Sequence, residues 1–186
     1  MGTLEIIMGP MFSGKTELLI QKYNILNPDK NNPNTALAFN YYKDTRYGEN
    51  CIASHNGLVI VSINIITISE IFTDHKYFNK FSHILINEAQ FFPDLKNCVI
   101  ELIEKYNKHV IICGLDSDYK RERFGQIWDL IPHADIIQKL KGKCNFCNNY
   151  SLFTHRLCNQ QEQEIIGNNI YIPVCRKCYY NNNSIG

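Results

Sequence analysis

Gly9-Pro10-Met11-Phe12-Ser13-Gly14-Lys15-Thr16 matches the phosphate-binding pattern G-x-x-x-x-G-K-[ST] without a substitution. Glycines let the backbone curl so that successive N–H groups face a phosphate, and the helix that follows presents its positive N-terminus to the same anion. In such a loop the lysine contacts the β- and γ-phosphates, and the hydroxyl of the last residue ligates Mg²⁺. We therefore expect residues 9–16 to bind a nucleoside triphosphate, with Lys15 and Thr16 in these two roles.

The segments on either side of the loop favour an α/β fold. Residues 4–8 are a short apolar run typical of a buried strand, and apolar residues recur at helical spacing over 15–26. Further strands are predicted at 35–40, 58–61, 63–67, 83–87, 110–113 and 136–140, with helices at 95–106 and just before Pro132. Strands that alternate with helices predict right-handed βαβ units and a mostly parallel sheet flanked by helices, as in P-loop NTPases.

A second polar site is predicted where the strand at 83–87 ends. Ligands of open α/β sheets bind at the carboxyl edge of the strands, and Asn87 and Glu88 stand there. P-loop proteins usually have an aspartate at the first of these positions to hold the magnesium, whereas Asn87 brings only a neutral amide oxygen. Glu88 is expected to accept a proton from a hydroxyl nucleophile or to orient a water. The alternative is that Glu88 caps a helix or faces solvent.

Two Cys-x-x-Cys pairs predict a metal site near the C-terminus. Cys144 with Cys147 and Cys175 with Cys178 supply four thiolates, which suit a closed, structural zinc site. The alternatives are that His155 or Cys158 replaces one of these ligands, or that the pairs form two disulfides. The remaining cysteines are expected to be buried small hydrophobes or surface thiols.

The zinc ligands also define the predicted domain organisation. Residues 1–140 carry the nucleotide-binding pattern, whereas 141–180 contain short strand-like runs, Asn-rich turns and the cysteine pairs. We expect the metal to stabilise this second unit, because so short a segment cannot bury a core of its own. Residues 181–186 are expected to form a disordered tail.

Composition and charge limit the partners and the compartment. The 186 residues carry a net charge of +1, without the basic excess that a polynucleotide-binding surface usually needs. No signal sequence and no long apolar run is visible, so we expect a cytoplasmic protein that binds neither nucleic acid nor membrane.

Six motifs in order carry a family resemblance. They are residues 9–16, Lys43-Asp44-Thr45-Arg46-Tyr47, Glu88-Ala89-Gln90-Phe91-Phe92, Gly114-Leu115-Asp116, Phe124-Gly125 and the two cysteine pairs. Together they resemble the thymidine kinase family of the cellular cytosolic and viral type, a P-loop domain with a zinc-bearing lasso. The one departure is Asn87, where the family has aspartate, and it puts the usual magnesium contact in doubt.

The resemblance implies transfer of the γ-phosphate of ATP to the 5′-hydroxyl of thymidine, with ATP, Mg²⁺ and Zn²⁺ as cofactors. It implies that Glu88 is the general base, that Lys15 and Arg46 stabilise the transferring phosphate, and that Asp44 lies near metal and sugar. It implies that Met11 and Phe91 line the base pocket, that Tyr171 packs on the base, and that Tyr119, Thr154 and Arg156 lie on segments that match the family. It further implies a homotetramer inhibited by dTTP.

The residues by themselves leave plainer interpretations open. Asp44 and Arg46 would otherwise be a surface ion pair, Phe91 and Tyr171 core aromatics, and Gln90 an exposed side chain. The alternative function is a P-loop ATPase in which Glu88 activates water and the zinc module is structural or binds a macromolecule. A non-catalytic nucleotide-binding protein is the third hypothesis, suggested by Asn87.

Overall fold

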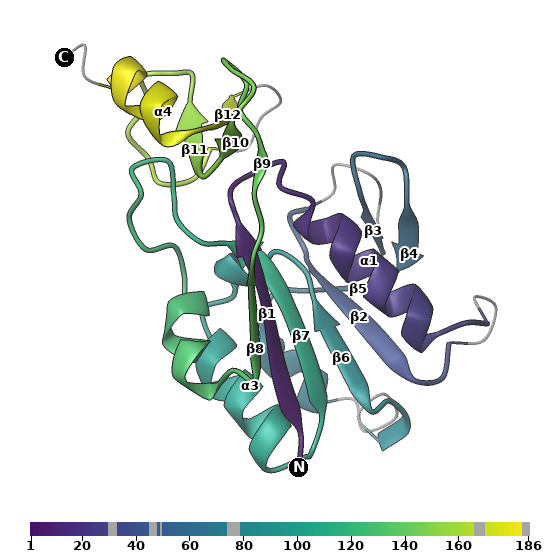
Figure 1. The fold of residues 1–186 in the computed structure, drawn as a ribbon. Helices are drawn as coiled ribbons and strands as arrows, with labels where there is room; N and C mark the ends of the chain where they lie inside the picture. The colour runs from purple at the N-terminus through teal and green to yellow at the C-terminus, as the bar shows by residue number, and fades with distance from the viewer. Residues whose placement is uncertain (30–32, 45–47, 49, 74–78, 166–169, 184–186) are drawn as a thin grey trace.

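The computed structural model describes residues 1–29, 33–44, 48, 50–73, 79–165 and 170–183 (Figure 1). Its centre is a six-stranded sheet of order β5-β2-β6-β7-β1-β8, in which every recorded pairing is parallel. The strands are β1 (Thr3–Gly9), β2 (Ala36–Tyr41), β5 (Ile63–Ile65), β6 (His83–Ile86), β7 (His109–Leu115) and β8 (Ile136–Lys139). The α/β fold predicted from the sequence is therefore confirmed.

The central strands are apolar on both faces, because layers cover the sheet on either side. Along β6, Ile84 and Ile86 pack into one core cluster and Leu85, between them, packs into the other, as the two-residue period of a strand requires. The helix α1 (Lys15–Leu26) and the hairpin of β3 (Cys51–Ala53) and β4 (Val59–Val61) cover one face. The other face is covered by α3 (Leu95–Glu104) and the 3₁₀ helices η1 (Ile68–Phe72) and η3 (Ile127–His133).

A small subdomain stands over the carboxyl edge of the sheet (Figure 1). It contains two antiparallel pairs, β9 (Gly142–Lys143) with β10 (Tyr150–Ser151) and β11 (Phe153–Arg156) with β12 (Tyr171–Val174), followed by α4 (Arg176–Asn183). Its buried core consists of Cys144, Val174, Cys175 and Tyr179. The subdomain touches the phosphate-binding loop directly, since the Met11 backbone N–H donates to Thr154 Oγ1 at 3.0 Å.

The C-terminal segment corrects one prediction. The helix α4 continues to Asn183, so a disordered tail from Asn181 is wrong for its first three residues. The side chain of Asn182 contributes to this helix by donating from Nδ2 to the Cys178 carbonyl at 2.7 Å. Residues 184–186 lie outside the described part of the chain. Among the helices that the structure describes, none has the length and apolarity needed to cross a membrane.

Candidate active site

The phosphate-binding loop joins β1 to α1 at the carboxyl edge of the sheet. A side chain at Gly9 would place its Cβ 2.6 Å from the Leu140 carbonyl oxygen, so the loop needs glycine where it leaves the strand. Gly14, in the left-handed conformation with φ 85°, is the N-cap of α1. Lys15 is almost fully buried, and its ammonium group donates to the Pro10 carbonyl at 2.7 Å across the loop. The predicted loop and helix are therefore present with the geometry of an anion site.

A cavity of about 330 Å³ opens between this loop, the sheet edge and the small C-terminal subdomain. That volume is in the range of small-molecule sites. Residues from all parts of the predicted site line the cavity: Met11, Phe12, Ser13, Gly14, Lys15, Thr16, Asp44, Asn87, Glu88, Phe91, Thr154 and Tyr171. Gly9 and Pro10 form the base of the same loop. One cavity thus collects residues that are widely separated along the chain.

Glu88 follows β6 and is held by a neighbour that the sequence did not identify. Its backbone is left-handed with φ 51°, and although it precedes η2 (Ala89–Phe91) its side chain makes no capping hydrogen bond. Instead, Gln90 Nε2 donates to Glu88 Oε2 at 2.7 Å, and Gln90 Oε1 accepts from the Leu115 N–H at 3.0 Å. The suggestion that Gln90 is exposed is wrong, because only 3% of it is accessible.

Gly125 explains why Gln90 is buried so tightly. A Cβ on Gly125 would lie 2.1 Å from the Gln90 carbonyl oxygen, and the residue has φ 63°. The backbone of residue 125 therefore packs directly on the backbone of residue 90. The side-chain amide that holds Glu88 lies against Gly114, where a Cβ would be 2.4 Å from Gln90 Oε1. The pair Phe124-Gly125, recognised from the sequence only as a motif, has this packing as its physical reason.

Asn87 takes part in a buried network of neutral groups. Its Nδ2 donates to Asn40 Oδ1 at 2.9 Å, and the Asn40 amide in turn donates to the carbonyls of Asp44 and Cys51. Asn87 Oδ1 accepts from the Cys113 thiol at 3.0 Å and lies 3.5 Å from Thr16 Oγ1. Burial raises the pKa of Cys113 to about 12, so the thiol stays protonated as a donor.

The predicted magnesium ligands are therefore close together, but they carry little charge. Thr16 and Asn87 offer two neutral oxygen atoms beside each other, and Asp44 lines the same cavity. This oxygen set fits a hard divalent cation that takes its remaining ligands from phosphate and water. Arg46 lies outside the described residues, so its pairing with Asp44 and its catalytic role stay predictions.

Aromatic side chains form one wall of the cavity. Phe91 stacks on Tyr41 with 5.0 Å between ring centroids and meets the edge of Phe124 at 5.4 Å. All three line the cavity, which places Phe91 at its surface rather than in the core. Tyr41 and Phe124 were not predicted as site residues, since nothing local distinguishes a cavity aromatic from a core aromatic.

Tyr171 and Tyr119 are placed differently from each other. Tyr171 lines the cavity and its hydroxyl accepts from the Ile165 N–H at 3.1 Å. Tyr119 is not found among the described residues that line the cavity. Its ring stacks under the Arg156 guanidinium at 3.6 Å, and its hydroxyl donates to the Gln161 carbonyl. This geometry does not support direct contact between Tyr119 and a substrate.

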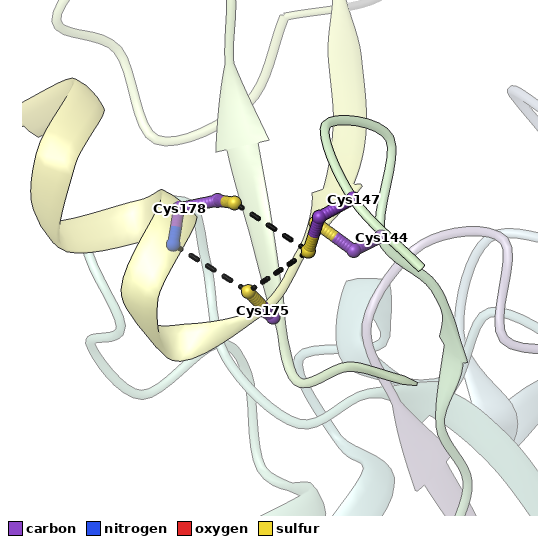
Figure 2. A group of neighbouring side chains, drawn as sticks. All are labelled: Cys144, Cys147, Cys175 and Cys178. Carbon is purple, nitrogen blue, oxygen red and sulfur yellow. Dashed lines mark hydrogen bonds between the residues drawn. The ribbon is translucent and has the colours of Figure 1, made fainter. Parts of the chain in front are cut away.

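The four predicted zinc ligands converge on one point (Figure 2). Their sulfur atoms all lie within 4.8 Å of one another, and Cys147 Sγ is 3.7 Å from the sulfurs of both Cys175 and Cys178. A tetrahedral zinc ion with bonds of ~2.3 Å separates its sulfurs by about 3.8 Å, so these distances fit the ion. The Cys178 backbone N–H donates to Cys175 Sγ and the Asn149 amide donates to Cys147 Sγ, each at 3.5 Å, and these two hydrogen bonds orient the sulfur atoms.

The alternatives to this ligand set are not supported. The sulfur separations of 3.7 Å far exceed a disulfide bond of about 2.05 Å, and the cysteines are free. The His155 ring packs against Tyr179 and Phe146, and the Cys158 thiol points to Gln160 Oε1 at 3.8 Å. In the part of the chain that is described, the candidate ligand group contains neither His155 nor Cys158.

Known proteins resemble this chain over most of its length. The family described as thymidine kinase matches residues 2–179. A thymidine kinase of Oryza sativa subsp. japonica is 36% identical over 182 residues, which cover 96% of this chain but 66% of the rice protein. A thymidine kinase of Choristoneura fumiferana entomopoxvirus is 36% identical over 187 residues, which cover 98% of this chain and 99% of the viral protein. A thymidine kinase of Mycoplasma mobile is 37% identical and is covered to 87%.

Proposed function

The chain belongs to the thymidine kinase family, and on that premise we propose that it transfers the γ-phosphate of ATP to the 5′-hydroxyl of thymidine. It is a thymidine kinase, a transferase that produces thymidine monophosphate and ADP. The observation that carries the proposal is the single cavity lined by the phosphate-binding loop, by Glu88 and by the Phe91 aromatic wall. The cavity thereby combines a binding site for the nucleotide phosphates, a carboxylate that can accept the proton of a hydroxyl group, and a flat apolar surface for a nucleobase.

The reaction needs positioning and charge stabilisation more than covalent help from the protein. Lys15 would contact the β- and γ-phosphates, and the loop N–H groups would hold them against the N-terminus of α1. Glu88, oriented by Gln90, would take the proton of the 5′-hydroxyl as its oxygen bonds to the γ-phosphorus and the bond to the β-phosphate oxygen breaks. Arg46 would stabilise the charge on the transferring group, as the family resemblance implies.

Magnesium would be held by Thr16, Asn87 and Asp44 together with the nucleotide. When bound, the ion neutralises charge on the phosphates. The residues fit this role through oxygen donors, but with less negative charge than an aspartate at position 87 would give. We therefore propose that this protein binds magnesium with lower affinity than relatives that have aspartate at this position.

The nucleoside would bind between the aromatic wall and the zinc-bearing subdomain. Phe91 and Met11 would contact the base from the P-loop domain (residues 1–140), and Tyr171 from the lasso domain (residues 141–180). Thr154 would act at the junction, because it bonds the Met11 backbone, and Tyr119 would contribute indirectly through Arg156. Zinc at the four cysteines would be structural, since four thiolates leave no open coordination position.

Three further properties are proposed from the family resemblance. They are a cytoplasmic location, a homotetrameric assembly and inhibition by dTTP. Support for the last is the cavity itself, which would admit the thymidine part of dTTP where thymidine binds. Sedimentation of the purified protein and inhibition kinetics test the second and the third.

Phosphate transfer from ATP with magnesium tests the function, in parallel reactions with thymidine, with deoxycytidine and without a nucleoside. Thymidine-dependent transfer that is lost in Glu88→Gln is expected. Nucleoside-independent hydrolysis would make the protein a P-loop ATPase instead. Binding of ATP without any turnover would favour the non-catalytic hypothesis.

A further inference from the structure

Arg156 is a buried cation whose hydrogen bonds, within the described part of the chain, all go to neutral oxygen atoms. It lies at the end of β11 with 5% of its surface accessible. Its Nη1 donates to the carbonyls of Gln160 and Glu162, and its Nη2 to the carbonyl of Gln163 and the hydroxyl of Tyr171. A guanidinium group is suited to this set because it offers several donors in one fixed plane.

Two tyrosine rings lie on the same guanidinium group. The Arg156 Cζ atom is 3.6 Å from the centroid of Tyr119 and 5.0 Å from that of Tyr171. Tyr119 belongs to the segment that follows β7, whereas Tyr171 begins β12 in the zinc-bearing subdomain. Stacking and hydrogen bonding by one side chain therefore connect segments from both parts of the molecule.

The chain that Arg156 organises forms a wall of the cavity. Residues 157–165 connect Arg156 to the end of the described segment, and Gln163, Glu164 and Ile165 line the cavity. The Ile165 N–H is fixed by the Tyr171 hydroxyl, to which Arg156 also donates. Residues 160–165 belong to no strand or helix, and Arg156, whose side chain does not line the cavity, holds them.

The segment after β7 is attached to the same loop. Gln163 Nε2 donates to Asp118 Oδ2 at 3.0 Å and to the Arg123 carbonyl at 3.1 Å. The Tyr119 hydroxyl donates to the Gln161 carbonyl at 3.2 Å. Because Asp118 and Gln163 both line the cavity, a shift of the loop would move two parts of its wall together.

We propose that Arg156 is a positioning residue that holds residues 160–165 and Tyr171 in the conformation that accepts the nucleoside. The inference rests on the proposed function and adds to it the residue that prearranges the nucleoside side of the cavity. Loss of the guanidinium would leave the loop to be ordered when the nucleoside binds, which weakens binding of the nucleoside and not of ATP.

Arg156→Lys tests this, because lysine keeps the charge but not the planar donor set. The matched control is Arg176→Lys, a guanidinium on the exposed start of α4 that stacks on Phe153 at 5.0 Å. We expect the KM for thymidine to rise about ten-fold or more in Arg156→Lys, with the KM for ATP and kcat within about two-fold of the parent. Zinc content should stay unchanged, and Arg176→Lys should behave as the parent.

Amide hydrogen exchange of residues 157–165 supplies a readout that does not need activity. Faster exchange there in Arg156→Lys, together with the selective rise in KM, supports the proposal. Unchanged exchange, or equal rises in the KM for thymidine and for ATP, overturns it. If the unmodified protein phosphorylates no thymidine, the proposed function fails and the exchange measurement alone decides whether Arg156 orders the loop.

Discussion

Asn87→Asp introduces the aspartate that the family resemblance implies at this position, and the structure predicts two opposite effects. The Asn87 amide now donates to Asn40 Oδ1 at 2.9 Å, in a site where Asn87 is 2% accessible. A carboxylate there would meet the Asn40 oxygen with no hydrogen between them. Asn40 can turn its amide to donate to the carboxylate, but it then loses its bonds to the carbonyls of Asp44 and Cys51.

Either arrangement leaves a buried acceptor without a donor, at a cost of about 1–3 kcal/mol. In a chain of this length 1 kcal/mol corresponds to ~2–4 °C in Tm, so we expect the Tm of the magnesium-free variant to fall by about 2–12 °C. With magnesium and nucleotide bound, the new charge lies beside the cation and the loss should shrink. The magnesium concentration for half-maximal activity should fall by about ten-fold, which corresponds to ~1.4 kcal/mol.

The assay is thermal unfolding of the variant and the parent with and without magnesium and ADP, followed by a magnesium titration of activity. The buffer must be free of chelator, because a chelator would also remove zinc. Asn107→Asp makes the same chemical change at an exposed loop position and is the control. A variant with the parent's Tm and the parent's magnesium midpoint would refute both the network and the placement of Asn87 beside the metal.

Three other predictions follow from single contacts. Gln90→Leu removes the donor to Glu88 and should lower kcat by about 10–100-fold with little change in the KM for ATP, because a hydrogen bond to a charged group is worth ~1.5–3 kcal/mol. An unchanged kcat in steady-state kinetics would contradict this. Removal of zinc by a chelator should weaken thymidine binding more than ATP binding, since Tyr171 and Thr154 belong to the subdomain that contains the four cysteines. Metal analysis checks the removal and calorimetry measures the two affinities. Equal losses of the two affinities would count against this prediction. Burial, and then the charge of His109, lower the pKa of His83 below 6.5, so the unfolded chain takes up the proton first and stability should be lost as pH falls below about 6.5. Urea unfolding between pH 7.5 and 5.5 should show a smaller loss for His83→Gln than for the parent, and equal losses would exclude His83 as the cause.

Features set by short-range chain geometry were predictable from the sequence. The helix predicted at residues 15–26 is α1 (Lys15–Leu26), because the loop glycine before it and the apolar spacing within it are local signals. The strand predicted at 83–87 is β6 (His83–Ile86), and its continuous apolar run is buried because layers cover both faces of the sheet. The four zinc ligands could be chosen because each Cys-x-x-Cys pair already places two sulfurs close together.

Features that depend on packing between distant segments were missed or misassigned. The Gln90 amide that holds Glu88 is fixed by the Leu115 N–H, from a different strand of the sheet, and no local pattern reports this contact. Tyr41 and Phe124 reach the cavity through the arrangement of β2 and of the segment after β7. Tyr119 lies on a segment that resembles the family, and only the packed structure shows that the Arg156 guanidinium lies on its ring.

The sequence by itself determined the phosphate-binding loop, the parallel α/β fold, the four cysteines that could hold a metal ion, and the family. All of these depend on residue types at fixed short spacings, where the chain leaves few conformations open. The tertiary structure decided which side chains share the cavity, that Asn87 joins a neutral network through Asn40, and that Arg156 binds the carbonyls of residues 160, 162 and 163. These outcomes depend on contacts between residues far apart along the chain, and such contacts exist only after the sheet, its covering layers and the zinc-bearing subdomain have packed together.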